Sequence, residues 1–371
     1  MAKSKKRRKR RASDTPMTHK AWIWVAIGLC ALALAAVGVM LSILLNDWFF
    51  TFYPAMSRAL MRPLAALSSL CPLSVWELAL PALALWAIIS LIVAIRRLKL
   101  QWLMGLLCGL SVGVSLFVVL WGLNHFGPTI DQKLSLDKRE YTVEELTEAA
   151  AFYLKEANAW SEQVPRDDTG AAAMPTFAEM AAEAAACYQT LGADSELFRG
   201  SCRPVKQVLF WKPMSYFGIT GIFVCLTGES CVNPDTYPAS LPFTMCHEMG
   251  HRMAFAAEDE ANFCAYLACR VSEDAALRYS GAYCAFLYCY NALYKVSPGT
   301  AKRLWDYAAD GVKTDAAAAS AHYAQYEGPV QDAATKVNDS YLKAFQEESG
   351  VQSYGEVADL LIALYLSEKS S

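Results

Sequence analysis

The chain has 371 residues, of which 55% are hydrophobic, and its mean hydropathy is +0.21. It carries 33 basic and 36 acidic residues, so its formal net charge is −3. This composition is too apolar for a wholly soluble protein and too polar for a chain that lies in a membrane throughout its length.

The first 123 residues predict a basic tail followed by a membrane domain. Eight of the first eleven residues are Lys or Arg, and residues 1–20 are expected to form a cytoplasmic tail. Three apolar runs follow at about 21–45, 75–95 and 102–123. Each is long enough to cross a bilayer core of about 30 Å. The first run exceeds the usual 7–15 residues of a signal peptide, so we expect it to remain as a helix.

The distribution of positive charge predicts the orientation of the chain. Three basic residues lie at 96–99 between the second and third runs, whereas the loop 46–74 holds only two. Basic loops favour the cytoplasmic side. We therefore expect a multi-pass cell-membrane protein whose residues 124–371 are extracytoplasmic. Residues 46–53 are rich in aromatic side chains, which suit the membrane–water interface. The segment 54–68 could form an interfacial helix or re-enter the membrane, and membrane lipid is an expected partner.

Charge also separates the two parts of the chain. Residues 1–123 hold 14 basic and 3 acidic residues, and residues 124–371 hold 19 basic and 33 acidic ones. This acidic balance argues against a nucleic-acid partner. The C-terminal 248 residues are enough for a domain with its own core.

The pattern after residue 124 predicts an α+β domain in a mainly α chain. A capping box at Thr142 begins a helix that should run to about 158. Three β-rich pieces could form a small hairpin or sheet, with a turn at Thr227-Gly228. The expected helices lie at 142–158, 176–191, 240–252, 258–278, 280–295, 298–310, 314–346 and 354–367, and the expected strands at 205–211, 219–225 and 230–234.

Nine of the twelve cysteines lie after residue 124, and their spacing contains no CxxC pair that would indicate a structural zinc site. Cys225 and Cys231 flank the predicted hairpin turn and could form a disulfide. Most of the others lie in apolar helical patterns, which is typical of small buried residues.

The strongest motif is His247-Glu248-Met249-Gly250-His251, an HExxH sequence. On a helix, residues four apart share a face, so both imidazoles can point at one metal ion. The Glu248 carboxylate is placed to act on a water at the same ion. Two histidines, one carboxylate and an open position are typical of a catalytic zinc site. The alternative is a solvated helix with two surface histidines.

The third ligand requires the chain to reverse. On one continuous helix Glu258 would lie about 10 Å beyond His251 along the axis. A turn is therefore expected between Arg252 and Ala257, although no residue there is a strong helix breaker. Glu258 and Glu260 compete for the ligand role.

The residue four positions later favours Glu258 over Glu260 as the third ligand. Asn262 follows Glu258 by four residues and could hydrogen-bond to a ligand histidine. Glu260 is followed at the same spacing by Cys264, which offers no such support. The assignment stays open between the two glutamates.

HExxH followed by Glu-x-x-Ala-Asn resembles the gluzincin pattern, and is similar to the motifs of HtpX-type membrane metallopeptidases and ImmA-type peptidases. The resemblance implies a zincin-like domain in which His247, His251 and Glu258 bind Zn²⁺. It further implies that Glu248 is the general base and that Asn262 supports a ligand. The gap between His251 and Glu258 is shorter than in those families.

The chain also resembles a family of bacterial multi-pass membrane proteins of unknown function, a likeness that covers nearly everything after the basic tail. No tested activity is implied by it. The stretches that carry this likeness are 120–124, 218–223, 246–248, 258–263, 337–343 and 353–355.

The function expected from these features is that of a membrane-anchored zinc metallopeptidase, a hydrolase that acts on a peptide or protein substrate. The strand 219–225 could pair with an extended substrate, or could only cover the active helix. The alternative function is a non-catalytic zinc- or ligand-binding sensor or envelope assembly protein. Residue type alone offers four candidates for stabilising an oxyanion: Tyr216, Tyr341, Tyr354 and His322.

Overall fold

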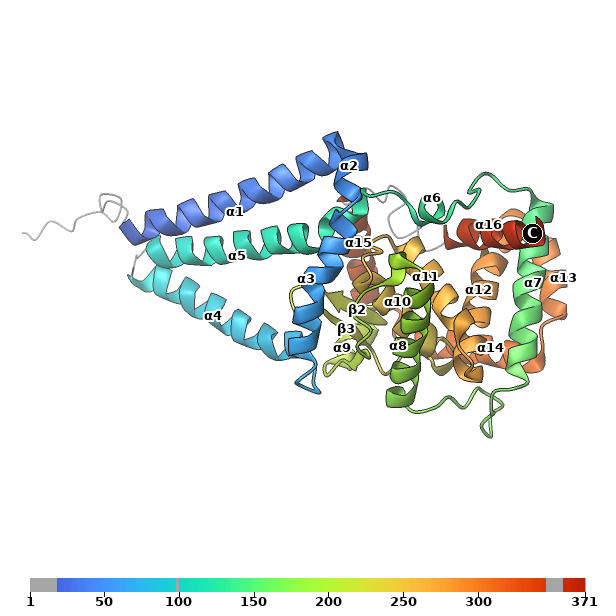
Figure 1. The fold of residues 1–371 in the computed structure, drawn as a ribbon. Coiled ribbons are helices and arrows are strands. Elements are labelled where there is room, and N and C mark those ends of the chain that lie inside the picture. The colour runs from blue at the N-terminus through green and yellow to red at the C-terminus, as the bar shows by residue number, and fades with distance from the viewer. Residues whose placement is uncertain (1–18, 98–99, 345–355, 371) are drawn as a thin grey trace, which may run out of the picture. The chain divides into compact units, whose positions relative to one another are not determined.

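The computed structural model describes residues 19–97, 100–344 and 356–370 (Figure 1). The chain divides into two compact units. The first comprises Met1–Met40 and Leu78–Val119, and the second comprises Leu41–Glu77 and Leu120–Ser371. Nearly all of the predicted basic tail lies outside the described residues.

Three long apolar helices account for most of the first unit. They are α1 (His19–Leu44), α4 (Val75–Arg97) and α5 (Leu100–Leu120). Each is long and apolar enough to cross a membrane, with candidate spans at His19–Leu44, Val75–Arg96 and Gln101–Leu120. The three predicted apolar helices are therefore confirmed, and the side of the membrane on which each loop lies stays a prediction.

The second unit is mainly helical and contains one small sheet (Figure 1). The helices before the sheet are α2 (Asn46–Phe50), α3 (Tyr53–Ser68), η2 (Gly122–Phe126), α6 (Ile130–Leu134), α7 (Val143–Ser161), α8 (Phe177–Asp194) and η3 (Glu196–Phe198). The sheet region contains β1 (Lys206–Gln207), α9 (Trp211–Tyr216), β2 (Gly221–Val224) and β3 (Glu229–Val232). After it come η4 (Pro238–Ser240), α10 (Leu241–Arg252), α11 (Glu258–Val271), α12 (Ala275–Val296), α13 (Pro298–Asp306), α14 (Asp310–Ala324), α15 (Pro329–Ala344) and α16 (Val357–Ser370).

Local sequence signals explain where several helices begin and end. The predicted capping box at Thr142 is confirmed: its hydroxyl accepts from the backbone N–H of Glu145, whose carboxylate in turn accepts from the N–H of Thr142. The single helix expected over 258–278 is wrong, because Asp274 caps a new helix, α12. The helix expected over 314–346 is likewise divided, since α14 ends at Ala324 and α15 begins at Pro329.

The sheet has the strand order β1-β3-β2. β2 pairs with β3 in the antiparallel sense, with Gly221 opposite Val232, which confirms the hairpin predicted at Thr227-Gly228. β1 pairs with β3 in the parallel sense and is shorter than the expected 205–211, because α9 begins at Trp211. In the described chain no strand pairs with the outer edge of β2.

Helix α10 lies at the centre of the second unit, where it packs against α8, α11, α12 and both strands of the hairpin (Figure 1). All twelve of its residues are buried. His247 is 9% exposed and His251 is 6% exposed. The alternative of a solvated helix with two surface histidines is therefore wrong.

Two buried glutamates join the sheet region to the start of α4. The Glu229 carboxylate accepts from the N–H of Val75 at 2.9 Å and of Trp76 at 3.1 Å, and it pairs with Lys206 Nζ at 2.6 Å. The Glu77 carboxylate accepts at 2.7 Å from each of two backbone N–H groups, those of residues 209 and 210. A carboxylate at the first turn of a helix is also favoured by the helix dipole.

Cys225 and Cys231, which could have paired across the hairpin, do not form a disulfide in the structure. Both are buried free thiols. Cys231 Sγ instead lies 3.6 Å from the hydroxyl of Ser74.

We expect Glu229→Ala to destabilise the protein by about 3 kcal/mol, because it leaves the Lys206 ammonium buried without its counter-ion. The measurement is thermal unfolding of the full chain in detergent. Glu148→Ala is the matched control, since its pair with Lys369 has the same 2.6 Å separation but half-exposed side chains. Its unfolding temperature should barely change. Equal effects of the two substitutions would contradict the assignment of Glu229 as a buried anchor.

Candidate metal centre

The imidazole rings of His247 and His251 lie side by side on α10 in a T-shaped arrangement. Their ring centroids are 4.6 Å apart and the rings are nearly perpendicular, at 88°. Pro242 lies in the first turn of this helix, where a missing N–H removes no hydrogen bond. The four-residue spacing thus places both imidazoles on the same face, as the sequence predicted.

A sharp reversal follows α10. Met253 ends the helix, and Ala254 adopts the left-handed conformation with φ of 72°. The N–H of Ala254 bonds to His251 O at 3.0 Å, and the N–H of Phe255 bonds to Gly250 O at 3.2 Å. This is the Schellman pattern that commonly ends helices, usually with glycine at the left-handed position. The predicted turn is confirmed, although its left-handed residue is an alanine.

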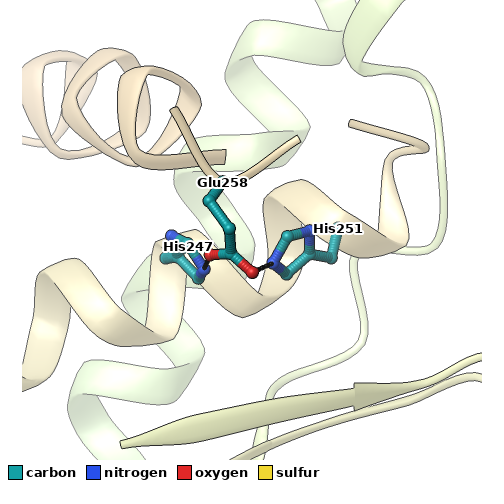
Figure 2. Close-up of side chains that lie close together, drawn as sticks. All are labelled: His247, His251 and Glu258. Atoms are coloured by element: carbon teal, nitrogen blue, oxygen red, sulfur yellow. Dashed lines mark ion pairs between the residues drawn. The ribbon is translucent and has the colours of Figure 1, made fainter. Parts of the chain in front are cut away.

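The reversal returns Glu258, the first residue of α11, to the histidine pair. In Figure 2 its carboxylate lies between the two rings. Glu258 Oε2 is 3.3 Å from His247 Nε2, and Oε1 is 3.8 Å from His251 Nε2. One ligand atom from each of the three side chains lies within 4.8 Å of the others.

The alternative glutamate lies elsewhere. Glu260 is buried, and its carboxylate accepts from the N–H of Ile130 at 2.6 Å. Burial raises the pKa of Glu260 to about 7. The side chain is therefore held by α6, and it does not join the His247–His251–Glu258 cluster.

The remaining ring nitrogens of both histidines are hydrogen-bonded. His247 Nδ1 lies 2.9 Å from Asn262 Oδ1, and His251 Nδ1 lies 2.8 Å from the carbonyl oxygen of Phe255. Since both partners are acceptors, each Nδ1 carries its proton and each Nε2 keeps a lone pair for a metal. Asn262 thus occupies the supporting position that its spacing from Glu258 predicted.

The donor set fits a zinc ion. Ligands about 2.0–2.2 Å from a tetrahedral zinc are about 3.4 Å apart, and the two nitrogen–oxygen separations are 3.3 and 3.8 Å. Beside them, Glu248 Oε2 is buried and has no hydrogen-bond partner among the described residues. A buried polar atom without a partner indicates a missing ligand, water or ion.

Glu248 lies on the face of α10 that packs against the β2–β3 hairpin. Its backbone carbonyl accepts from the Ser230 hydroxyl of β3 at 2.7 Å. Its side chain lies against Gly221 of β2, where an added Cβ would come within 2.6 Å of Glu248 Cγ. Only glycine leaves room for the carboxylate at this point. Burial raises the pKa of Glu248 to about 8, and neighbouring His247 opposes this change.

The pKa values of the two histidines shift in opposite directions. Burial would lower the pKa of His247, but the hydrogen bond and charge of Glu258 raise it. Burial and then His247 lower the pKa of His251 to about 4. Burial would raise the pKa of Glu258, yet its contacts with both histidines lower it to about 2.

Two further side chains lie near the cluster and were missed by the sequence reasoning. Trp121 donates from Nε1 to His251 O at 3.1 Å, and its ring lies edge-on to His251 at 5.8 Å. The His125 ring lies 5.2 Å from Trp121. Burial and then His251 lower the pKa of His125 to about 3, so its imidazole is neutral. The sequence signals were the stretch 120–124, which carries the likeness to the family of unknown function, and the place of His125 just after the third apolar run.

The four residues offered as oxyanion donors are not brought to the cluster. The Tyr216 ring packs edge-to-face against the Tyr326 ring, with centroids 5.1 Å apart. His322 Nε2 lies 2.7 Å from the carbonyl oxygen of Asp235. Neither makes a hydrogen bond or ion pair with the cluster in the described structure. The side chains of Tyr341 and Tyr354 lie outside the described residues.

The fold and the cluster define a mainly helical protein with three candidate membrane helices, a small sheet and a His-His-Glu group that could hold a metal ion. The family model described as "Protein of unknown function (DUF3810)" matches residues 50–362, and the chain belongs to this family. The predicted membership in a family of unknown function is thereby confirmed. No curated protein and no solved structure matches the chain.

The strained turn gives a stability prediction. We expect Ala254→Gly to leave the protein as stable as the parent or more stable, because glycine removes a left-handed penalty of about 1–2 kcal/mol. The loss of one buried methyl group offsets part of this gain. The measurement is thermal unfolding of the full chain in detergent.

Ala317→Gly is the matched control, because Ala317 is exposed within α14. It should cost about 1 kcal/mol through helix propensity alone. The interpretation of the turn is wrong if Ala254→Gly is as damaging as its control.

The ligand assignment predicts zinc content. The full chain, purified in detergent without added metal, should hold one zinc per chain, measured by mass spectrometry of the metal. Glu258→Gln should lose the metal, whereas Glu260→Gln should retain it. Asn262→Ala should weaken zinc binding by about 10–100-fold. A chain that loses zinc with Glu260→Gln and keeps it with Glu258→Gln would reverse the assignment.

Proposed function

We propose that this chain is a membrane-anchored, zinc-dependent peptidase of the gluzincin type. The observation that carries the proposal is the meeting of His247, His251 and Glu258 beside Glu248, whose buried carboxylate has one oxygen without a partner among the described residues. The resemblance of HExxH and Glu-x-x-Ala-Asn to gluzincin motifs supports the same reading, and with it a zincin-like arrangement of the domain.

The three clustered side chains would hold the zinc through His247 Nε2, His251 Nε2 and the Glu258 carboxylate. Zinc in sites of this type lowers the pKa of water to about 7 and polarises carbonyl oxygens. Asn262 and the Phe255 carbonyl fix the orientation of both rings, so little reorganisation is needed to receive the ion.

Glu248 is the proposed general base. Its desolvated carboxylate accepts a proton from the water that attacks the peptide carbonyl, then donates that proton to the departing amine nitrogen. Its contact with Gly221 keeps the side chain in place during both transfers.

Strand β2 is the proposed binding edge for an extended peptide. The N–H of Asn233 bonds to Thr220 O at 2.8 Å, which fixes the alternation of the antiparallel ladder. Gly221 and Phe223 therefore direct their backbone groups away from β3, toward the open edge. A substrate that adds a strand at this edge would pass beside Glu248.

The proposed substrates are peptides or proteins that reach the membrane surface. Trp121, which contacts His251, directly follows the third candidate span at Leu120. A residue that contacts the proposed site is thus the first residue after a candidate membrane span. Lipid and a polypeptide substrate are the partners that this arrangement supports.

Glu248→Gln tests the proposed base. We expect the full chain in detergent to cleave a mixed peptide library, detected by mass spectrometry of the products, and the variant to lose that cleavage. Its zinc content should equal that of the parent. Cleavage that survives the substitution would remove Glu248 from the mechanism.

Gly221→Ala provides a second variant that changes no titratable group. The added methyl should displace the Glu248 carboxylate and lower cleavage strongly while zinc stays bound. Gly299→Ala is its control, since a Cβ there meets no atom closer than 3.7 Å. A parent chain that binds zinc but cleaves no library member would instead support the non-catalytic sensor or assembly function.

A further inference from the structure

The segment that links β1 to β2 presents apolar side chains to the outside. From Val208 to Thr220 the only charged residue is Lys212. Met214 and Ser215 face inward, whereas Phe210 is 51% exposed and Phe217 is 46% exposed. The exposed apolar residues of this segment, called the aromatic loop below, are Leu209, Phe210, Trp211, Tyr216, Phe217 and Ile219.

The aromatic loop is fastened to the start of the second candidate span. The carboxylate of Glu77, the third residue of that span, accepts from the N–H groups of Leu209 and Phe210 at 2.7 Å each. Its neighbour Trp76 packs against a small core that contains Val208, Met214 and Cys231. Hydrogen bonds and apolar packing therefore both hold the loop where α4 begins.

A loop fixed at this position contacts the first residues of a candidate membrane span, Trp76 and Glu77. Aromatic side chains are enriched where membrane and water meet, because one end of the ring is apolar and the other can stay hydrated. Lys212 could extend its ammonium toward lipid phosphates while its stem stays apolar. Exposed apolar patches of this kind mark interaction sites rather than ordinary surface.

We propose that the aromatic loop is a lipid-contacting surface, seated in the interface of the bilayer that α4 enters. This inference goes beyond the peptidase proposal and does not depend on zinc or on cleavage. Ile219 lies two residues before Gly221, whose backbone touches Glu248. Lipid contact of the loop therefore also holds the candidate metal centre at the membrane surface.

The experiment measures quenching of Trp211 by lipid. The full chain is reconstituted into phosphatidylcholine vesicles with or without bromine on the acyl chains, since bromine quenches tryptophan fluorescence on contact. Subtracting the emission of Trp211→Phe from that of the parent isolates the signal of this one residue. Trp305→Phe gives the control signal, because the Trp305 ring stacks on Phe286 at 5.9 Å inside the second unit.

We expect brominated lipid to remove most of the Trp211 signal and to leave the Trp305 signal unchanged. Phe217→Trp offers the same measurement by addition, should Trp211→Phe fail to fold. A Trp211 signal quenched by acrylamide in water but not by brominated lipid would overturn the proposal. Resistance of Trp211 to both quenchers would also overturn it, and would mean that protein, from a second copy or a partner, covers the loop.

Discussion

A reversal of the chain at Met253–Ala257 is the constraint on which the candidate metal centre depends. A helix that continued through these residues would carry Glu258 about 10 Å away from the histidines along its axis. The left-handed Ala254 ends α10 and lets the N–H of Phe255 close onto Gly250 O. The same turn directs the carbonyl of Phe255 onto His251 Nδ1. One backbone feature thus both positions the third side chain and fixes the tautomer of the second.

The buried glutamates around the sheet differ in how many hydrogen-bond and ion-pair partners their carboxylates have. Glu229 accepts two backbone N–H groups and pairs with Lys206, and Glu77 accepts two backbone N–H groups. Glu260 accepts one N–H from α6. Glu248 alone of these four keeps a buried oxygen without a hydrogen-bond partner among the described residues. Because an unpaired buried carboxylate is costly, this difference favours the chemical role proposed for Glu248, whereas the other three hold the fold together.

Much of the site could be predicted from sequence because it rests on helical spacing. The spacing of four residues placed His247 with His251 on one helix face, and it favoured Glu258 with Asn262 while leaving Glu260 as the alternative. The turn at Ala254 could be required but not located, since alanine gives no signal for a left-handed position that usually selects glycine. The sequence equally could not show that Gly221 touches Glu248.

The fold shows the same division between local and long-range information. Apolar runs and capping boxes predicted the membrane helices and α7, since those signals lie within each element. The helices expected over 258–278 and 314–346 were too long, because alanine-rich and apolar patterns continue across their breaks. Trp121 and the glutamates of the sheet act between segments far apart in the chain, and no periodicity reports such contacts.

The C-terminal turn of α10 depends on segments that adjoin the candidate spans in the sequence. The last carbonyls of a helix have no partner within it and must find donors elsewhere. His251 O receives the indole N–H of Trp121, and Met253 O receives Nη1 of Arg58 on α3 at 3.4 Å. The unit that contains the cluster accordingly includes Leu41–Glu77 and begins again at Leu120, before the expected domain boundary at residue 124. Residues 124–371 alone would lack both donors, so the carbonyls of His251 and Met253 would lose the side-chain partners that the preceding segments supply.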